Sequence, residues 1–205
     1  FKDFLNWKDR ISYKERIQKS IEVSGQEEVG IIAKGEINGT KVCCVAMNFL
    51  FAGGSVGHNF GECIIKAAET CTEENLPLVI FTESGGARMQ EGAISLMQLP
   101  RMTVAIQIFK DIKPRQASIL FACSPTTGGL SASLANICDF TLAEHDTDLI
   151  AFAGRRVIEG TLNNQEVIPP DFQTAIDQKR NGFLDDIIER KYQKEKISTL
   201  ISLLQ

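Results

Sequence analysis

Two glycine pairs, each placed after an apolar strand-like segment, constrain the fold of this chain more than any other feature. Residues 76–81 lead to Gly85-Gly86, residues 117–122 lead to Gly128-Gly129, and a helix-like segment follows each pair. The first turn of a helix carries N–H groups without intrahelical partners and the positive end of the helix dipole. Because glycine has no Cβ, a substrate oxygen can approach these donors closely. We interpret the two junctions as oxyanion-stabilising sites.

The rest of the pattern predicts strands that alternate with helices, which indicates an α/β fold with largely parallel pairing. Asn38-Gly39 between two apolar runs is a strong hairpin signal. We expect strands at 29–37, 41–49, 76–81, 117–122, 140–142 and 149–152. We expect helices at 58–74, 87–109, 128–137 and 155–162, a further helix that starts at 169–171 and ends at 181–182, and amphipathic helical segments within 1–25 and 187–205.

A hairpin–strand–helix unit that recurs in this way is typical of the crotonase-like (ClpP/crotonase) β-β-α superhelix. We therefore predict a single crotonase-like domain over residues 1–205. In that superhelix, successive helix N-termini reach the same edge of the sheet. The two glycine pairs are then expected to lie close together and to share one site.

Composition excludes several other classes of protein. A chain of 205 residues that is 43% hydrophobic suits one globular domain with a full core. A net charge of −4 argues against nucleic-acid binding, and no run of eighteen apolar residues predicts a membrane span. The six cysteines contain no Cys-x-x-Cys pair, so we expect reduced, mostly buried thiols. Cys123 borders the second glycine pair, but neither of the two histidines stands in a motif that would activate it as a nucleophile.

Several motifs resemble one enzyme family in the same order and at similar spacing. They are residues 51–57 (FAGGSVG), 84–91 (SGGARMQE), 95–98 (SLMQ), 125–133 (PTTGGLSAS), 152–159 (FAGRRVIE) and 170–175 (PDFQTA). Together they resemble the carboxyltransferase β subunit of multi-subunit, bacterial- and plastid-type acetyl-CoA carboxylase. The similarity extends from about Tyr13 to about Ile188.

This resemblance implies a biotin-dependent acetyl-CoA carboxyltransferase that moves a carboxyl group from carboxybiotin, held on a carrier protein, to acetyl-CoA. The product is malonyl-CoA, in the committed step of fatty-acid synthesis. In this family the biotin ureido nitrogen is thought to take the α-proton, so the enzyme supplies oxyanion stabilisation and excludes water. The sequence offers no Ser–His–Asp set and no paired carboxylates, which agrees with that chemistry.

The motifs also carry the expected site residues. We expect the amides of Gly85 and Gly86 to form one oxyanion hole, and those of Gly128 and Gly129 to line the same cleft. Contacts to the substrate or to CoA are expected from nine residues: Gly53, Gly54, Ser55, Ala87, Arg88, Thr126, Thr127, Arg155 and Arg156. Three alternatives remain open: a bare turn at 53–55, a structural ion pair between Arg88 and Glu91, and a solvated helix start or subunit contact at 155–156.

The resemblance also implies partners. These are a carboxyltransferase α subunit in an α2β2 heterotetramer, a biotin carboxyl carrier protein and a biotin carboxylase, in the plastid stroma or the bacterial cytoplasm. The family's four-cysteine zinc ribbon has no counterpart here, so we expect no metal in this chain. Glu83 stands where the family usually has Ala, and strand alternation allows it to point away from Ser84. Two other functions remain open: a carboxyltransferase or decarboxylase for another acyl-CoA, and a catalytically silent homologue.

Overall fold

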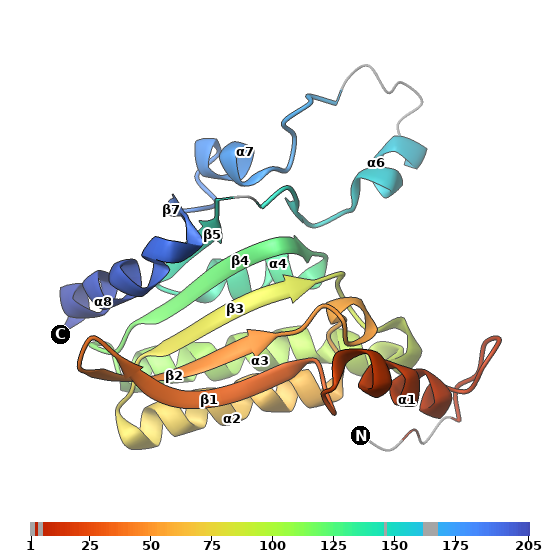
Figure 1. The fold of residues 1–205 in the computed structure, drawn as a ribbon, viewed down its shortest axis with the longest axis horizontal. Helices are drawn as coiled ribbons and strands as arrows, with labels where there is room; N and C mark the ends of the chain where they lie inside the picture. Colours follow the sequence, from red (N-terminus) through yellow and green to blue (C-terminus); the bar gives the residue numbers. More distant parts are fainter. Residues whose placement is uncertain (1–2, 4–5, 146, 162–167) are drawn as a thin grey trace.

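A computed structural model describes residue 3 and residues 6–145, 147–161 and 168–205 of the chain. Its centre is a mixed sheet in the strand order β1-β2-β3-β4-β5-β7, with β6 paired to β4 (Figure 1). Among the strands of the described residues, β1 and β2 form an antiparallel hairpin, and the later strand pairings are parallel. The strands are β1 (Gly30–Ile37), β2 (Thr40–Met47), β3 (Leu78–Ser84), β4 (Ser118–Thr127), β5 (Phe140–Glu144), β6 (Ile150–Ala151) and β7 (Asp186–Ile188).

Helices cover both faces of this sheet. The two long helices, α2 (His58–Glu74) and α3 (Ala93–Ile112), lie side by side under one face (Figure 1). Ile64 of α2 and Ile106 of α3 are buried in one apolar core with Ile80 of β3. On the other face, Ile197 and Ile201 of α8 (Gln193–Leu204) join Phe121 in a second apolar cluster. The predicted α/β class is therefore confirmed.

The other described helical elements are α1 (Tyr13–Ser24), which has 12 residues, and several shorter helices and turns. The shorter elements are α4 (Gly129–Ala132), α5 (Leu134–Ile137), α6 (Arg155–Thr161), α7 (Ala175–Arg180) and the 3-10 turns η1 (Ala52–Gly54), η2 (Met89–Glu91) and η4 (Arg190–Tyr192). Figure 1 shows α1 next to the turn η1, on the side of the sheet where β1 and β2 lie. Among the described residues, no helix is long and apolar enough to cross a membrane.

Both helices predicted to follow the glycine pairs differ from expectation. The helix expected at 87–109 begins only at Ala93, after the turn η2 and after Gly92, whose φ of 55° interrupts regular helix. The helix expected at 128–137 is divided into α4 and α5 at Ser133, which has non-helical dihedrals. Glycine-rich starts resist continuous helix because glycine loses the most backbone entropy on ordering.

The helical predictions near the C-terminus were also too long. Residues 186–188 form strand β7 at the sheet edge, and the regular helix of the predicted 187–205 segment is only α8. The helix expected to start at 169–171 starts at Ala175, where the Thr174 hydroxyl accepts a hydrogen bond from the Asp177 N–H at 3.2 Å. Alternation alone could not separate a three-residue β-strand from the helix that follows it.

Candidate functional site

The two glycine pairs lie side by side in the structure. β3 and β4 are parallel neighbours in which Ser84 pairs with Thr126, so the residues two positions further along each strand also face each other. A Cβ added at Gly128 would lie 3.0 Å from the Cα of Gly86. Both residues have positive φ, 106° at Gly86 and 69° at Gly128. The predicted convergence therefore favours glycine at both positions, because a side chain at Gly128 would crowd the Gly86 backbone and the positive φ of Gly86 disfavours any other residue.

Most of the amides expected to bind an oxyanion are already hydrogen-bonded within the chain. The Gly85 N–H donates to the Gly53 carbonyl at 2.9 Å, and the Gly86 N–H donates to Ser84 Oγ at 3.0 Å. The Gly128 N–H donates to the Ala151 carbonyl at 2.8 Å. In this structure these three groups shape the backbone and are not open to a ligand.

Two neighbouring amides remain open. Val56 bonds to both sides of Ala87: its N–H donates to the Gly86 carbonyl and its carbonyl accepts from the Arg88 N–H, each at 2.8 Å. A residue bridged in this way directs its own N–H to the opposite side, here away from Val56. Within the part of the chain that is described, the N–H groups of Ala87 and Gly129 have no acceptor. They are the candidate oxyanion donors of the site.

A glycine-rich loop supports the first of these donors. Residues 51–57 pack directly on the end of β3, and a Cβ added at Gly54 would lie only 2.1 Å from the Glu83 carbonyl oxygen. The Ser84 hydroxyl donates to the Gly54 carbonyl at 2.6 Å. Gly53 accepts the bond from Gly85 described above. Gly53 and Gly54 thus hold the β3 end in place, which makes their role in this structure one of support.

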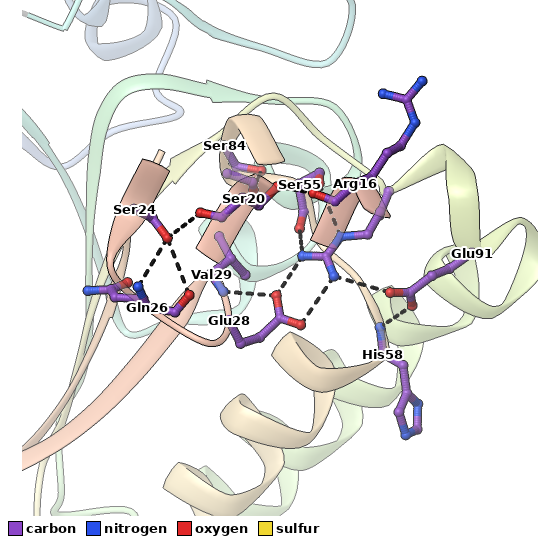
Figure 2. A network of polar contacts seen from close by, with 12 residues as sticks. Arg16, Ser20, Ser24, Gln26, Glu28, Val29, Ser55, His58, Ser84 and Glu91 are labelled. Atoms are coloured by element: carbon purple, nitrogen blue, oxygen red, sulfur yellow. Dashed lines mark hydrogen bonds and ion pairs between the residues drawn. The ribbon is translucent and has the colours of Figure 1, made fainter. Parts of the chain in front are cut away.

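Arg88 lies inside the protein, where it is 1% exposed. Its guanidinium group is bonded to Glu28, Ser55 and Glu91, with Nη2 2.6 Å from Glu28 Oε1 and Nη1 3.2 Å from Glu91 Oε1. Figure 2 labels these three partners. The Ser55 carbonyl accepts from Nη2 at 2.8 Å, and Ser55 Oγ accepts from Nε at 3.2 Å. Burial acts to lower the pKa of Arg88, but the bonds and charge of Glu28 offset it and raise that pKa. In this structure Arg88 forms the ion pair with Glu91 that the alternative describes, and its predicted contact with CoA stays a prediction.

The other predicted contact residues are also engaged or lie outside the description. The Thr126 hydroxyl donates to the Cys123 carbonyl at 2.8 Å, and the Thr127 hydroxyl donates to the Ser84 carbonyl at 3.0 Å. The Thr127 hydroxyl therefore links β4 to β3, and the Thr126 hydroxyl also lies 3.1 Å from the Thr82 carbonyl of β3. The side chains of Arg155 and Arg156 lie outside what the structure describes, so their predicted role stays a prediction.

Glu83 and Ser84 lie on opposite faces of the sheet, as alternation predicts. Glu83 lines a cavity of about 380 Å³ together with Cys123, Glu144 and Arg190, while Ser84 points to Gly54. Burial, aided by the charge of Glu144, raises the pKa of Cys123 to about 12. A thiol with that pKa is protonated at neutral pH and is a poor nucleophile. All six cysteines are free, and no group of three potential metal ligands occurs among the described side chains.

A second cavity, of about 370 Å³, lies between α1 and the glycine-rich loop. Gly53 and Leu50 line its loop side, and Arg16, Lys19 and Ser20 line its helix side. Lys19 is exposed and lies close enough to Glu15 for their charges to interact, and Arg16 is paired with Asp9. The sequence analysis did not find this cavity, because α1 shows only an ordinary amphipathic pattern. The proximity of α1 to the loop is a property of the fold.

Backbone amides gathered at adjacent strand ends are an arrangement that can stabilise a developing oxyanion. The family model described as "Carboxyl transferase domain" matches residues 9–202. The chain belongs to the carboxyl transferase domain family.

Curated relatives agree with this family assignment. The chain is 42% identical over 203 residues to the acetyl-coenzyme A carboxylase carboxyl transferase subunit beta of Trichormus variabilis. The alignment covers 99% of this chain and 63% of that protein. It is 42% identical over 202 residues to the subunit of the same name from Rhizobium leguminosarum bv. trifolii, covering 98% of this chain and 65% of the relative. The chain therefore spans somewhat less than two thirds of the length of these relatives.

Solved structures confirm the crotonase-like fold of the carboxyl transferases. A Pseudomonas malonate decarboxylase MdcD-MdcE hetero-dimer superposes with a TM-score of 0.74 at 20% identity, over 97% of this chain and 89% of that chain. A transcarboxylase 12S core superposes with a TM-score of 0.70 at 24% identity, over 85% of this chain and 33% of that chain. At these identities the similarity concerns the fold alone.

Proposed function

We propose that this chain is the carboxyltransferase β subunit of a multi-subunit, biotin-dependent acetyl-CoA carboxylase and that it acts with an α partner. The reaction transfers a carboxyl group from carboxybiotin to acetyl-CoA and gives malonyl-CoA. The observation that carries the proposal is the pair of unoccupied amides, Ala87 N–H and Gly129 N–H, at two adjacent glycine junctions. The relatives named above, which are acetyl-CoA carboxylase subunits, give the substrate class. The compartment that fits such a subunit is a bacterial cytoplasm or a plastid stroma.

The chain's own contribution to this chemistry is electrostatic. When acetyl-CoA loses its α-proton, negative charge develops on the thioester oxygen. Preorganised N–H groups that point at this oxygen stabilise the charge, and each such donor contributes roughly 10²–10³ in rate. Carboxybiotin supplies the carboxyl group and the base when it is bound. A ureido oxygen also accepts hydrogen bonds, so the free amides fit either oxygen, and the remaining donors are expected from the partner.

The direct test of this function is malonyl-CoA decarboxylation with biocytin as the carboxyl acceptor. We expect decarboxylation by the chain in complex with a carboxyltransferase α subunit, and none by the chain alone, because a site that lacks part of its donors cannot stabilise both oxyanions. The control omits biocytin from the complex. A well-formed complex without biocytin-dependent decarboxylation would favour the silent-homologue alternative, with Glu83 the first residue to examine.

The partner surface is proposed at the start of α3. Leu99 borders Gly129, since a Cβ added at Gly129 would lie 2.2 Å from Leu99 Cδ1. Three apolar residues of the same region are exposed: Met89, Leu96 and Met97, of which Met89 is 80% exposed. Apolar side chains that cluster beside an incomplete site are typical of a surface covered by another chain. A partner seated here also brings its own donors next to Gly129.

This surface gives a prediction for assembly. We expect Met97→Asp to weaken binding of the α subunit by about tenfold or more, because a charge replaces an apolar contact in the interface. Isothermal titration calorimetry of the two purified chains measures the effect. The matched control is Leu203→Asp, which changes an exposed apolar residue at the far end of α8. Equal affinities of the two variants would place the interface elsewhere.

The cavity beside α1 is proposed to hold the phosphates of the CoA ester. Arg16 and Lys19 supply cations on one wall, and Gly53 connects this cavity to the glycine-rich loop. We expect Lys19→Glu to raise the KM for malonyl-CoA about three- to tenfold with little change in kcat, because the charge acts on binding in both ground and transition states. Lys14→Glu, on the same helix but outside the cavity, is the control. A Lys19→Glu enzyme with unchanged KM removes this cavity from the CoA path.

A further inference from the structure

We infer that the buried cluster formed by Tyr13, Glu28, Arg88 and Glu91 is a positioning device for the Ala87 amide. This inference rests on the proposed function, because the amide matters only if it binds a developing oxyanion. Arg88 follows Ala87 directly, so its side chain fixes one end of the peptide segment that carries the donor. The cluster gathers side chains from three parts of the chain that are distant in sequence, because Arg88 and Glu91 are only three positions apart.

Each contact of the cluster ties a different element to the site. The Tyr13 hydroxyl, at the start of α1, donates to Glu91 Oε1 at 2.5 Å and accepts from Arg88 Nη1 at 3.3 Å. Glu28, just before β1, also accepts from the Val29 N–H at 2.8 Å. Arg88 stacks over the ring of Phe51, 5.3 Å from its centroid. Small movements of α1 or of the β1 start are therefore transmitted to Arg88.

Glu91 has a second function within the cluster. Its Oε2 accepts a hydrogen bond of 2.5 Å from the N–H of His58, and His58 is the first residue of α2 (Figure 2). Gly57, the residue before α2, makes no side-chain cap of its own. A carboxylate at a helix N-terminus is stabilised by the helix dipole. The start of α2 therefore neutralises part of the charge of Glu91, in a cluster that has two carboxylates and one guanidinium.

The burial of the cluster makes its geometry strict. Arg88 and Glu91 are 1% and 2% exposed, and Tyr13 is 4% exposed. Burial raises the pKa of Tyr13, so its hydroxyl stays protonated and can donate to Glu91. Removing one partner of a buried ion pair leaves the other charge uncompensated. We expect the backbone around that charge to shift so that the charge can be solvated. Ala87 directly precedes Arg88 in the chain, so we expect that shift to displace the Ala87 N–H from its position as an oxyanion donor.

Tyr13→Phe tests this inference, because it removes one hydroxyl and little volume. We expect kcat of the α-containing complex to fall about tenfold or more while KM for malonyl-CoA stays within about threefold, which indicates loss of transition-state stabilisation. The matched control is Tyr192→Phe, at the exposed second tyrosine of the chain. Hydrogen exchange at the Arg88 amide, which bonds to the Val56 carbonyl, is expected to accelerate in Tyr13→Phe and not in the control.

Glu28→Gln is the second variant and decides the matter if Tyr13→Phe does not fold. Its control is Glu74→Gln, which breaks the exposed pair between Lys34 and Glu74. A lower melting temperature with kcat and Arg88 exchange unchanged would show that the cluster only stabilises the fold, and would overturn the inference. A wild-type complex without any transfer activity rejects the proposed function instead. The exchange data then decide whether the cluster positions the segment.

Discussion

Gly86→Val is expected to abolish carboxyl transfer, with a loss of at least about 10²–10³ in kcat. Gly86 has a φ of 106°, a conformation that a β-branched residue strongly disfavours, and it lies against Gly128. Valine forces the peptide that follows it to rotate, and that peptide carries the Ala87 N–H. Steady-state biocytin-dependent decarboxylation of malonyl-CoA by the complex with the α subunit measures the loss.

Two comparisons separate this effect from misfolding. Gly35→Val is the matched control, because Gly35 lies on the exposed face of β1 with ordinary φ and with nothing within 4 Å of an added Cβ. It is expected to keep full activity. The affinity of Gly86→Val for CoA, measured by calorimetry, is expected to stay within about threefold of the wild type. A Gly86→Val complex with normal turnover would contradict the role given to this junction.

Gly54→Ala is expected to destabilise the protein by about 3 kcal/mol, the sum of a steric overlap and a strained φ. Gly54 has a φ of 65°, and an added Cβ would lie 2.1 Å from the Glu83 carbonyl oxygen. The loop must lift from the β3 end, and the bond from Ser84 Oγ to the Gly54 carbonyl is then lost. For a chain of this size the melting temperature falls by about 6–12 °C. Differential scanning calorimetry measures it.

Gly53→Ala is an unusually close control for this experiment. Gly53 has the same φ of 65°, but nothing lies within 4 Å of an added Cβ. It is expected to cost only about 1 kcal/mol, from backbone strain. The difference between the two variants therefore measures the contact between the loop and β3. Equal melting temperatures would show that this contact does not hold the loop.

The sequence predicted the sheet and the convergence of the glycine pairs because both depend on local signals. Asn38-Gly39 fixed the hairpin, and apolar runs fixed the strands. It did not predict which amides are free. The Gly85 and Gly86 amides bond to Gly53 and Ser84, and the first of these contacts depends on a loop that lies thirty-two positions earlier. Spacing within a motif does not reveal such a tertiary contact.

Arg88 illustrates the same limit for a side chain. An arginine after a glycine pair suggests a phosphate ligand, yet its partners Tyr13 and Glu28 come from segments that carry no motif. The alternative with Glu91 was visible because those residues are three positions apart. The contacts of Tyr13 and Glu28 with Arg88 span 75 and 60 positions, so only the three-dimensional structure reveals them. The cavity beside α1 was missed for the same reason.

The most direct test of the account observes the amides themselves. Backbone amides of the chain, labelled with ¹⁵N at Gly and Ala and bound to an unlabelled α subunit, are recorded with and without a non-reactive acyl-CoA analogue whose carbonyl mimics the enolate oxygen. The account predicts that the Ala87 and Gly129 amide protons move downfield on binding, while those of Gly85 and Gly86, already hydrogen-bonded, change little. Shifts at Gly85 and Gly86 with none at Ala87 would contradict the account and would identify the Gly85 and Gly86 amides as the oxyanion donors.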